Sequence, residues 1–449
     1  MATRKKTAKK TTRKSTKKAS ARKPAPAVTG GEMPAAAQAI SPPPPQQLGT
    51  ANTEFLAKQA ALDAVANKHN VADHLVIVRA DEAPNPYIVR RPTGITELDI
   101  QLAGGFPAGG TCFVSGPDNS GKTWLMLATM AMQQRIYEHE CIQAMAVTEG
   151  GFPYDQAMRV GLRIAVPDEM IRQWQQWLIQ RGMTPYTSEQ LYAFKQQVGD
   201  FRIVRGSTGE EVLQLVLELV KTRACSIIAL DSIQGLQPQA DAAKEMDENA
   251  KRAAHATMMT EFFKRYIPLT TGLSGLNETT LLMTQQVRQN SEKATAPSYM
   301  QAALKDWMIT GAYASKHFKL VDLMVWDGGV KKKGEGSARQ AVGKTMKWFF
   351  EKGKAGCHDN LSGEVLYSYE ILSGVDFVGT VVDSAMQRGV LRKVGNKYTL
   401  VRPETGKVLD DYTAPSIKKF REMLDADPEF ELAVRQEILA AAGVQCLYR

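Results

Sequence analysis

One stretch organises this chain: Gly116-Pro117-Asp118-Asn119-Ser120-Gly121-Lys122-Thr123. It has the spacing of a glycine, four residues and then Gly-Lys-Thr. Residues 111–115 before it read as a short buried strand, and residues 124–134 after it read as an apolar helix. A strand, a glycine loop and a helix in this order are typical of a phosphate-binding loop. A plain glycine turn before a core helix is the alternative, which the agreement of spacing, Lys-Thr pair and flanks disfavours.

The residue types in this loop suit a nucleoside triphosphate. Gly116 and Gly121 let backbone N–H groups point inward, and the start of the following helix adds partial positive charge. Lys122 can then reach the β- and γ-phosphates, while the Thr123 hydroxyl can ligate a metal ion. We therefore predict that residues 116–123 bind ATP together with Mg²⁺.

Short apolar strands alternate with helical patterns through most of the chain. This alternation predicts an α/β fold, a phosphate-loop ATPase core whose mostly parallel sheet is covered on both faces. After about residue 375 the pattern changes to that of a small α+β domain. The expected strands are 111–115, 142–148, 201–204, 226–231, 279–284, 320–326, 345–350, 365–370 and 397–401. The expected helices are 121–138, 155–163, 208–223, 249–266, 377–389 and 416–442.

The composition is that of a soluble protein with an appended basic arm. The chain has 449 residues, 56 of them Lys or Arg and 47 of them Asp or Glu. Eleven of the cations lie in residues 1–23, so the remainder holds 45 cations against 47 acids and is nearly neutral. No apolar run is long enough to span a bilayer, and the five cysteines are scattered. We expect a cytoplasmic protein with no membrane partner and with reduced thiols.

The first 90 residues divide into an arm, a spacer and a helix. We expect residues 1–50 to be a disordered basic arm with a proline-rich linker, because such a composition cannot bury a core. We favour contact with nucleic acid as the role of the arm, and a targeting signal and a merely solvated charge run are the alternatives. Residues 52–70 carry apolar positions at helical spacing, which predicts a small helix that packs on a neighbour.

Three polar residues follow predicted strands, where ligands of a parallel sheet bind. Asp231 ends the strand 226–231 and suits a magnesium-bound water. Glu149 follows the strand 142–148 and could orient an attacking water. Gln286 could contact the γ-phosphate and report it to the polar segment that follows, which would act as a switch. For both carboxylates the alternative is a cap on the next turn or helix, and for the segment after Gln286 it is a solvated loop.

Several cations are candidates for contact with a sugar-phosphate backbone. A solvated charged surface is the alternative for all of them. They are Lys251, Arg252, Lys264, Arg288 and Lys347.

The combined pattern resembles one family, the bacterial and phage RecA-type recombinases. The resemblance covers roughly residues 52–410 and is greater for the divergent phage members than for the cellular protein. It implies protomer docking by residues 51–90, an ATPase core over 91–374 and a C-terminal α+β domain over 375–449. The segments that carry it are 92–99, 104–107, 116–123, Glu149, 227–232, 286–288, 352–354 and 374–377.

The resemblance implies an ATP-dependent filament on single-stranded DNA that pairs this strand with a homologous duplex. By it, Glu149 activates water, Asp231 supports Mg²⁺, and Gln286 couples ATP to a DNA loop over 287–311. A first DNA loop would span 238–253. Lys352 and Lys354 would reach the ATP of a neighbouring protomer, where their charge completes the site.

The resemblance leaves some points open. The position of the family's adenine-stacking aromatic residue falls on Gln156, so Tyr154 is the candidate for contact with the base. Single-stranded and double-stranded DNA, further copies of the chain, and single-strand-binding and loading proteins are the expected partners in a bacterial or phage-infected cell. A hexameric DNA motor and a non-enzymatic, ATP-regulated DNA-coating protein are the alternative functions.

Overall fold

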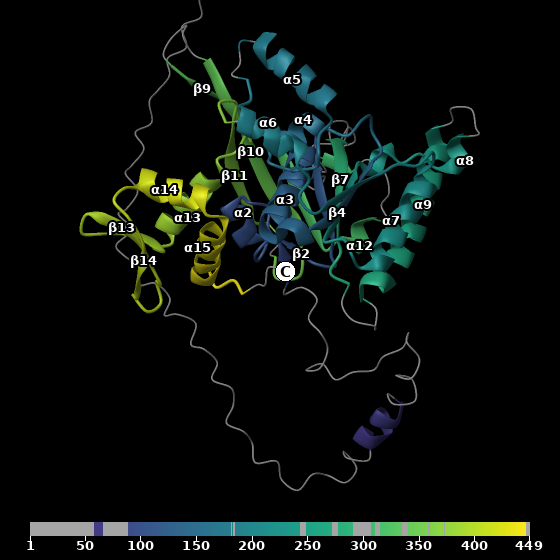
Figure 1. Cartoon of the computed structure of the whole chain (residues 1–449). Helices are drawn as coiled ribbons and strands as arrows, with labels where there is room; N and C mark the ends of the chain where they lie inside the picture. The colour runs from purple at the N-terminus through teal and green to yellow at the C-terminus, as the bar shows by residue number, and fades with distance from the viewer. Residues whose placement is uncertain are drawn as a thin grey trace, which may run out of the picture. The chain divides into compact units, whose positions relative to one another are not determined.

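A computed structural model describes residues 58–65, 89–180, 182, 185–242, 248–271, 277–290, 307–309, 315–334, 340–357, 360–371 and 373–445 (Figure 1). The chain divides into two compact units, Met1–Ala64 and Val65–Arg449. Residues 58–64 of the first unit are helical, as predicted for 52–70. The predictions for the basic arm and linker over 1–50 lie outside the described residues. All elements below belong to the second unit.

A central mixed sheet has the strand order β11-β10-β9-β3-β7-β6-β4-β5, and β8 pairs with β7. The strands from β9 to β5 in this order run parallel, and β10 and β11 are antiparallel to their neighbours. The predicted α/β class with a mostly parallel sheet is confirmed. The strands are β3 (Thr111–Gly116), β4 (Ile142–Val147), β5 (Asp200–Val204), β6 (Ile227–Asp231), β7 (Thr280–Gln289), β8 (Trp307–Ile309), β9 (Val321–Lys333), β10 (Gln340–Gly353) and β11 (Ser362–Ser368).

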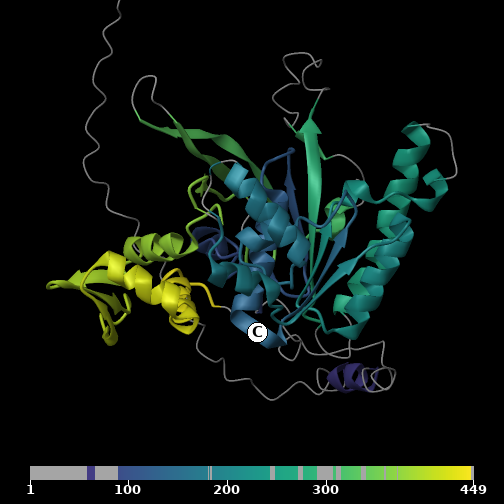
Figure 2. The same cartoon turned by 45° about the horizontal axis from the view of Figure 1, so that its top comes forward.

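Helices cover both faces of this sheet (Figures 1 and 2). Side chains of β3 alternate between two hydrophobic clusters because successive residues of a strand point to opposite faces. Cys112 and Val114 join the cluster under α3, whereas Phe113 joins the cluster under α7 and α9. Burial on both faces is why the strands are apolar throughout. The helices are α2 (Thr96–Gln101), α3 (Lys122–Tyr137), α4 (Tyr154–Arg159), α7 (Gly209–Thr222), α8 (Gln239–Ala242), α9 (Glu248–Thr271) and α12 (Ser315–Phe318).

Two parts of the core differ from the sequence prediction. Helices α5 (Asp168–Gln180) and α6 (Ser188–Lys195) occupy a stretch to which no element was assigned. In α5, Ile171 and Leu178 are buried and Trp174 packs against the same cluster, so its apolar residues do follow helical spacing. The β9–β10 ribbon also extends beyond the predicted strands, up to the pair Lys333 and Gln340 (Figure 2). Exposed polar residues in this part give no alternating hydrophobic pattern.

The C-terminal part has a core of its own, as the α+β pattern predicted. It contains a three-stranded antiparallel sheet of β12 (Leu391–Val394), β13 (Lys397–Val401) and β14 (Val408–Ala414). Helices α13 (Phe377–Gln387), α14 (Ile417–Ala426) and α15 (Pro428–Ala441) pack around it. The single helical stretch expected over 416–442 is broken at Asp427, whose carboxylate caps α15 at the N–H of Phe430 (3.0 Å). A small ladder of β1 (Arg90–Arg91) and β2 (Phe106–Pro107) completes the core.

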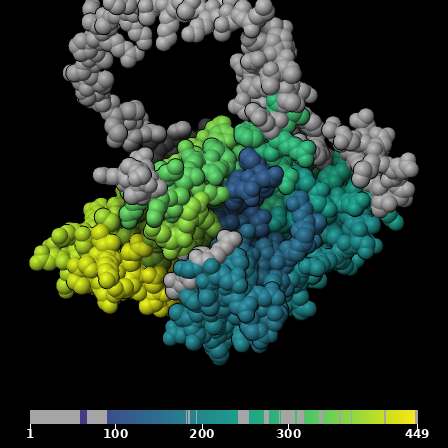
Figure 3. Space-filling model, turned by 90° about the horizontal axis from the view of Figure 1, so that it is seen from above, coloured from purple at the N-terminus to yellow at the C-terminus, as the bar shows by residue number. Residues whose placement is uncertain are grey.

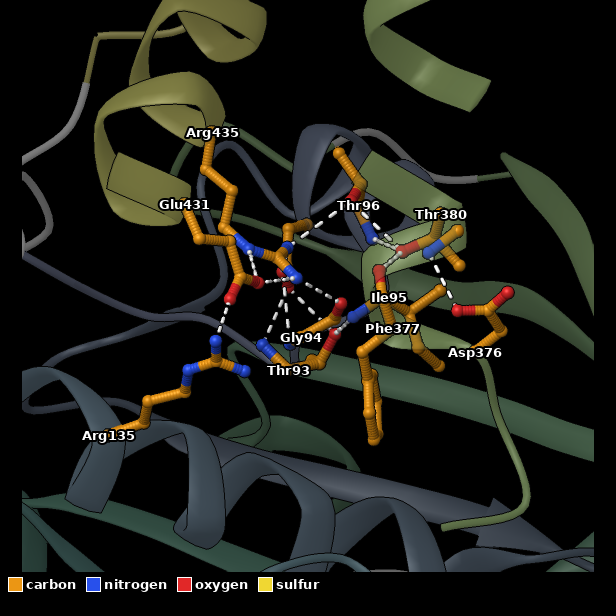
Figure 4. Close-up of polar contacts among 12 residues, drawn as sticks. Thr93, Gly94, Ile95, Thr96, Arg135, Asp376, Phe377, Thr380, Glu431 and Arg435 are labelled. Atoms are coloured by element: carbon orange, nitrogen blue, oxygen red, sulfur yellow. Dashed lines mark hydrogen bonds and ion pairs between the residues drawn. The ribbon is translucent and has the colours of Figure 1, made fainter. Parts of the chain in front are cut away.

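Buried ion pairs hold this C-terminal domain to the part of the chain that forms the central sheet (Figure 4). Arg435 of α15 donates to the carbonyl of Gly94 (2.9 Å) and to the hydroxyl of Thr96 (3.2 Å). Glu431, one turn earlier, pairs with Arg435 (2.9 Å) and also with Arg135 in the last turn of α3. The domain is thereby tied to the far end of the helix that begins at the glycine loop.

Candidate nucleotide-binding site

The glycine loop runs from the end of β3 to the first turn of α3. A Cβ atom at Gly116 would collide with the carbonyl of Val325, so the backbones approach too closely for any other residue. Gly121 has φ +98° and no side chain caps the helix that follows it. The first N–H groups of α3 are thus left for a ligand. Seen from above, the part of the core drawn in blue forms a patch of surface between the parts drawn in green and in teal (Figure 3).

Lys122 is the cation of this loop. The described hydrogen bonds of its ammonium group go to neutral acceptors only. Its Nζ donates to the carbonyls of Gly116 (3.0 Å) and Pro117 (2.6 Å), and the residue is 9% exposed. Burial lowers the pKa of Lys122, while the nearby carboxylate of Asp118 acts in the opposite sense. The hydroxyl of Ser120 is buried without a hydrogen-bond partner among the described residues. These donors fit a phosphate group, since each would gain an anionic acceptor.

Asp231 joins three elements beside the loop. Its Oδ2 accepts a hydrogen bond from the hydroxyl of Thr123 (2.7 Å), and its Oδ1 accepts one from Thr284 on β7. The structure therefore brings together the two residues predicted to serve Mg²⁺. In the part of the chain that the structure describes, no group of three or more His, Cys, Asp or Glu is placed to hold a metal ion. A carboxylate and a hydroxyl fit Mg²⁺, which is usually held by one or two protein groups with phosphates and water.

Glu149 lies next to Asp231, because Val147 pairs with Asp231 in the sheet. Its carboxylate is exposed and accepts a hydrogen bond from Ser232. Thr148 fixes this position by donating to the carbonyl of Ser232 (2.6 Å) and accepting from its N–H (2.8 Å). The structure therefore places Glu149 beside Ser232 at the strand end, and its proposed role in orienting a water molecule stays a prediction.

Gln286 pairs directly with Gly116 across the β3–β7 ladder. The side chain of Gln234 holds it from the other side, accepting from its N–H (3.1 Å) and donating to its carbonyl (3.4 Å). The candidate sensor is therefore adjacent to the first residue of the loop. Most of the switch expected after it, including 291–306, lies outside the described residues.

Some residues of the site were not found by sequence reasoning. Thr284 and Gln234 act through contacts between strands, which no local pattern reveals. Gly235 was given no role, yet a Cβ there would meet the side chains of Thr148 and Glu149. The only local signal was a small residue soon after Asp231.

Lys352 and Lys354 do not lie at the loop of their own chain. In the sheet Lys352 pairs with Asp322, at the start of β9, and β9 starts beside Cys112. Gly116 is four residues further along β3, which corresponds to roughly 13 Å. Both lysines thus belong to the opposite edge of the sheet, and their assignment to a neighbour's ATP stays a prediction.

The remaining candidates come from several elements. Tyr154 begins α4, with its ring centroid 4.8 Å from that of Phe152. Lys264 pairs with Glu261 (2.8 Å) and Lys347 with Glu364 (3.4 Å). Arg288 is exposed on β7. Lys251 and Arg252 lie in the first turns of α9, and their side chains are outside the described residues. Their proposed contacts with base or DNA stay predictions.

The sheet, the glycine loop and the adjoining carboxylates define an α/β nucleotide-binding core of the phosphate-loop class. Known proteins make this more specific, although no protein-family model matches the chain. The chain is 24% identical over 395 residues to a protein RecA from a Nostoc species, covering 86% of this chain and 90% of that one. The identity to the protein RecA of Thermus thermophilus is also 24%, over 82% of this chain and 89% of the relative. The chain is thus similar to RecA proteins over most of its length, at low identity.

None of the helices in the described part of the chain is long and apolar enough to cross a membrane.

Proposed function

We propose that this protein is a DNA-dependent ATPase that forms filaments on single-stranded DNA and exchanges strands with a homologous duplex. The observation that carries the proposal is the pairing of Gly116 with Gln286. It joins the first residue of the phosphate loop to the strand from which the candidate DNA segment begins. A contact between Gln286 and the γ-phosphate can therefore reach that segment without passing through another element.

Each residue at the strand ends has a distinct proposed task in hydrolysis. Lys122 turns its ammonium group from the loop carbonyls to the β- and γ-phosphates. Thr123 and Asp231 would hold Mg²⁺, which would neutralise phosphate charge. Glu149 accepts a proton or hydrogen bond from the attacking water, after its carboxylate leaves the hydroxyl of Ser232.

ATP turnover with and without single-stranded DNA tests this proposal. We expect DNA to stimulate the wild type, and Glu149→Gln to lower the stimulated rate by about 10²- to 10⁴-fold while ATP still binds. Asp168→Asn is a matched control, because Asp168 is an exposed carboxylate on α5 paired with Lys195. It should turn over ATP like the wild type. A wild type without DNA stimulation would overturn the proposal.

Mixing two inactive variants tests the proposed sharing of an ATP site between neighbours. One variant carries Lys352→Ala and Lys354→Ala, and the other carries Glu149→Gln. If the lysines act on the neighbour's ATP, some interfaces of the mixture combine an intact glutamate with intact lysines. The mixture should then hydrolyse ATP faster than either variant alone. Rates that merely average would refute the shared site.

The basic arm supports a second candidate, a DNA-coating protein whose ATP site only stabilises the bound state. Removing residues 1–47 separates the two, because a coat held by the arm loses most of its affinity and its salt dependence. A filament former keeps ATP-dependent binding after the truncation. Electron microscopy of the DNA complex distinguishes continuous filaments from the rings of a hexameric motor.

Strand exchange is the most specific part of the proposal, together with a phage-like setting. Strand exchange is measured by the joint molecules that form between single-stranded DNA and a homologous duplex. We expect joint molecules that require ATP and homology. Filaments that hydrolyse ATP without forming them would limit the protein to DNA binding.

A further inference from the structure

A second buried lysine lies on the face of β3 opposite the phosphate loop. Lys319, between α12 and β9, is 1% exposed. Its Nζ donates to Asp322 (2.7 Å) and to the side-chain oxygen of Gln285 (2.7 Å), and it lies 4.2 Å from the ring centroid of Phe113. Asp322 also accepts a hydrogen bond from Ser115 (2.6 Å). We name Lys319, Asp322, Ser115 and Gln285 the lysine cluster.

The lysine cluster spans the three central strands of the sheet. Gln285 belongs to β7, Ser115 to β3 and Asp322 to β9, which are neighbours in that order. Ser115 directly precedes Gly116, and Gln285 directly precedes Gln286. Because side chains alternate along a strand, the cluster lies just behind the loop and the candidate sensor. A movement of either strand end would therefore shift the side chains of the cluster.

The lysine cluster also joins the two ends of the segment that leaves the sheet after β7. The chain departs beyond Gln289, forms β8 and α12, and returns to the sheet at Lys319. The contact between Lys319 and Gln285 thus joins the returning end to the departing end. The candidate DNA segment lies between these two points.

Stability alone is a weak explanation for such a cluster. A buried ion pair often contributes no more than apolar side chains of the same volume, because both charges lose their hydration. The amide nitrogen of Gln285 is fully buried and has no hydrogen-bond partner among the described residues, which adds a further cost. The pair instead fixes the positions of the three strands relative to one another, through its short polar contacts.

We propose that Lys319 is a positioning residue that couples the ATP site to the segment between β7 and β9. It holds Gln285 against β3, and so keeps the adjacent Gln286 beside the first residue of the loop. This inference rests on the proposed function, in which the segment binds DNA. Lys319 itself touches neither ATP nor DNA.

The test separates positioning from stability with two variants of the full-length chain. Lys319→Met leaves Asp322 buried without its cation and should lower the unfolding temperature. The double variant Lys319→Met, Asp322→Leu removes both charges and should regain most of the lost stability. Lys419→Met is the control for an exposed lysine, since Lys419 is 57% exposed, pairs with Glu422 and is no candidate for contact with ATP or DNA. In the double variant we expect ATP affinity within about threefold of the wild type, and loss of most DNA stimulation.

A double variant that is as stable as the wild type and keeps its DNA stimulation would overturn the inference. A wild type that shows no stimulation contradicts the proposed function instead, and a second readout then decides on Lys319. Trp307 of β8 pairs with Gln289 and is 43% exposed, so it reports on the segment. ATP should change the fluorescence that Trp307→Phe removes, in the wild type and not in the double variant. An equal change in both would refute the positioning role.

Discussion

Two buried lysines flank the same strand and are held in opposite ways. Lys122 is 9% exposed, and its described hydrogen bonds go to two neutral carbonyls of its own loop. Lys319 is 1% exposed and is neutralised by Asp322 at 2.7 Å. A buried cation without a hydrogen-bonded carboxylate can bind an anionic ligand, whereas a neutralised one holds the strands around it in position. The difference separates the candidate binding site from the cluster that positions it.

The junction of the C-terminal domain resembles the lysine cluster rather than the loop. Arg435 and Glu431 are almost fully buried and satisfy each other. Asp99 lies 3.8 Å from Arg435 and accepts hydrogen bonds from Thr93 and Gly94. Burial raises the pKa of Asp99 to about 6, against the lowering effect of Arg435. The network in Figure 4 is therefore a closed set of charges that ties two domains together.

The largest expected effect is on the neutralised lysine. Lys319→Met should lower the free energy of unfolding by about 3–5 kcal/mol, because it leaves a buried carboxylate unpaired. Chemical denaturation monitored by circular dichroism measures this loss. A loss below about 1 kcal/mol would remove the contrast between the two lysines.

The corresponding change at the loop should affect ligand binding and spare the fold. Lys122→Ala should weaken ATP binding by at least about 100-fold, or roughly 3 kcal/mol, since a charged contact to phosphate is lost. Its unfolding temperature should stay the same or rise, because burial of this ammonium is unfavourable. Isothermal titration calorimetry and thermal unfolding give the two values. A variant that binds ATP normally would disprove the assignment of the loop.

The junction makes a prediction about pH. The folded-state pKa of Asp99 is about 6, above its ordinary value of 3.8, so the native state binds the proton more tightly than the unfolded state. The stability contribution of this group is present below pH 4 and is lost as the pH rises through 6. Relative to Asp99→Asn, the wild type should gain up to about 3 kcal/mol between pH 7 and pH 4. Chemical denaturation of both proteins across this pH range measures the gain. Stabilities that change in parallel with pH would contradict the raised pKa of Asp99.

The smallest effect is expected for an exposed pair. Lys347 and Glu364 are 40% and 56% exposed at 3.4 Å. Lys347→Ala should therefore change the free energy of unfolding by no more than about 0.5 kcal/mol. If Lys347 contacts DNA, the variant should also flatten the salt dependence of DNA binding by about one unit. An unchanged salt slope would remove Lys347 from the DNA-binding set.

Local sequence patterns predicted the centre of the fold well. The strands 111–115, 142–148 and 226–231 lie within one residue of β3, β4 and β6. These strands are buried on both faces and end in polar residues, so the local sequence shows where each strand begins and ends. The positions of Lys122, Asp231 and Glu149 at the sheet's carboxyl edge followed from the same reasoning.

Contacts between distant residues could not be predicted in this way. Lys319 and Asp322 look like two ordinary surface charges in the sequence, and only the packing of β9 against β3 buries them. Thr284 is one polar residue in an apolar strand until β6 brings Asp231 beside it. Helix α5 is different, because its apolar residues do follow helical spacing and the helix could have been predicted from the sequence. Burial of a charge is a property of the tertiary fold.

The central claim is that a triphosphate in the loop controls the affinity for single-stranded DNA through Gln286. The most direct measurement is the fluorescence anisotropy of a labelled single-stranded oligonucleotide, titrated at fixed salt with a non-hydrolysable ATP analogue and without nucleotide. We predict at least about tenfold tighter binding with the analogue for the wild type, and no such difference for Gln286→Ala. Equal affinities with and without nucleotide in the wild type would contradict the account.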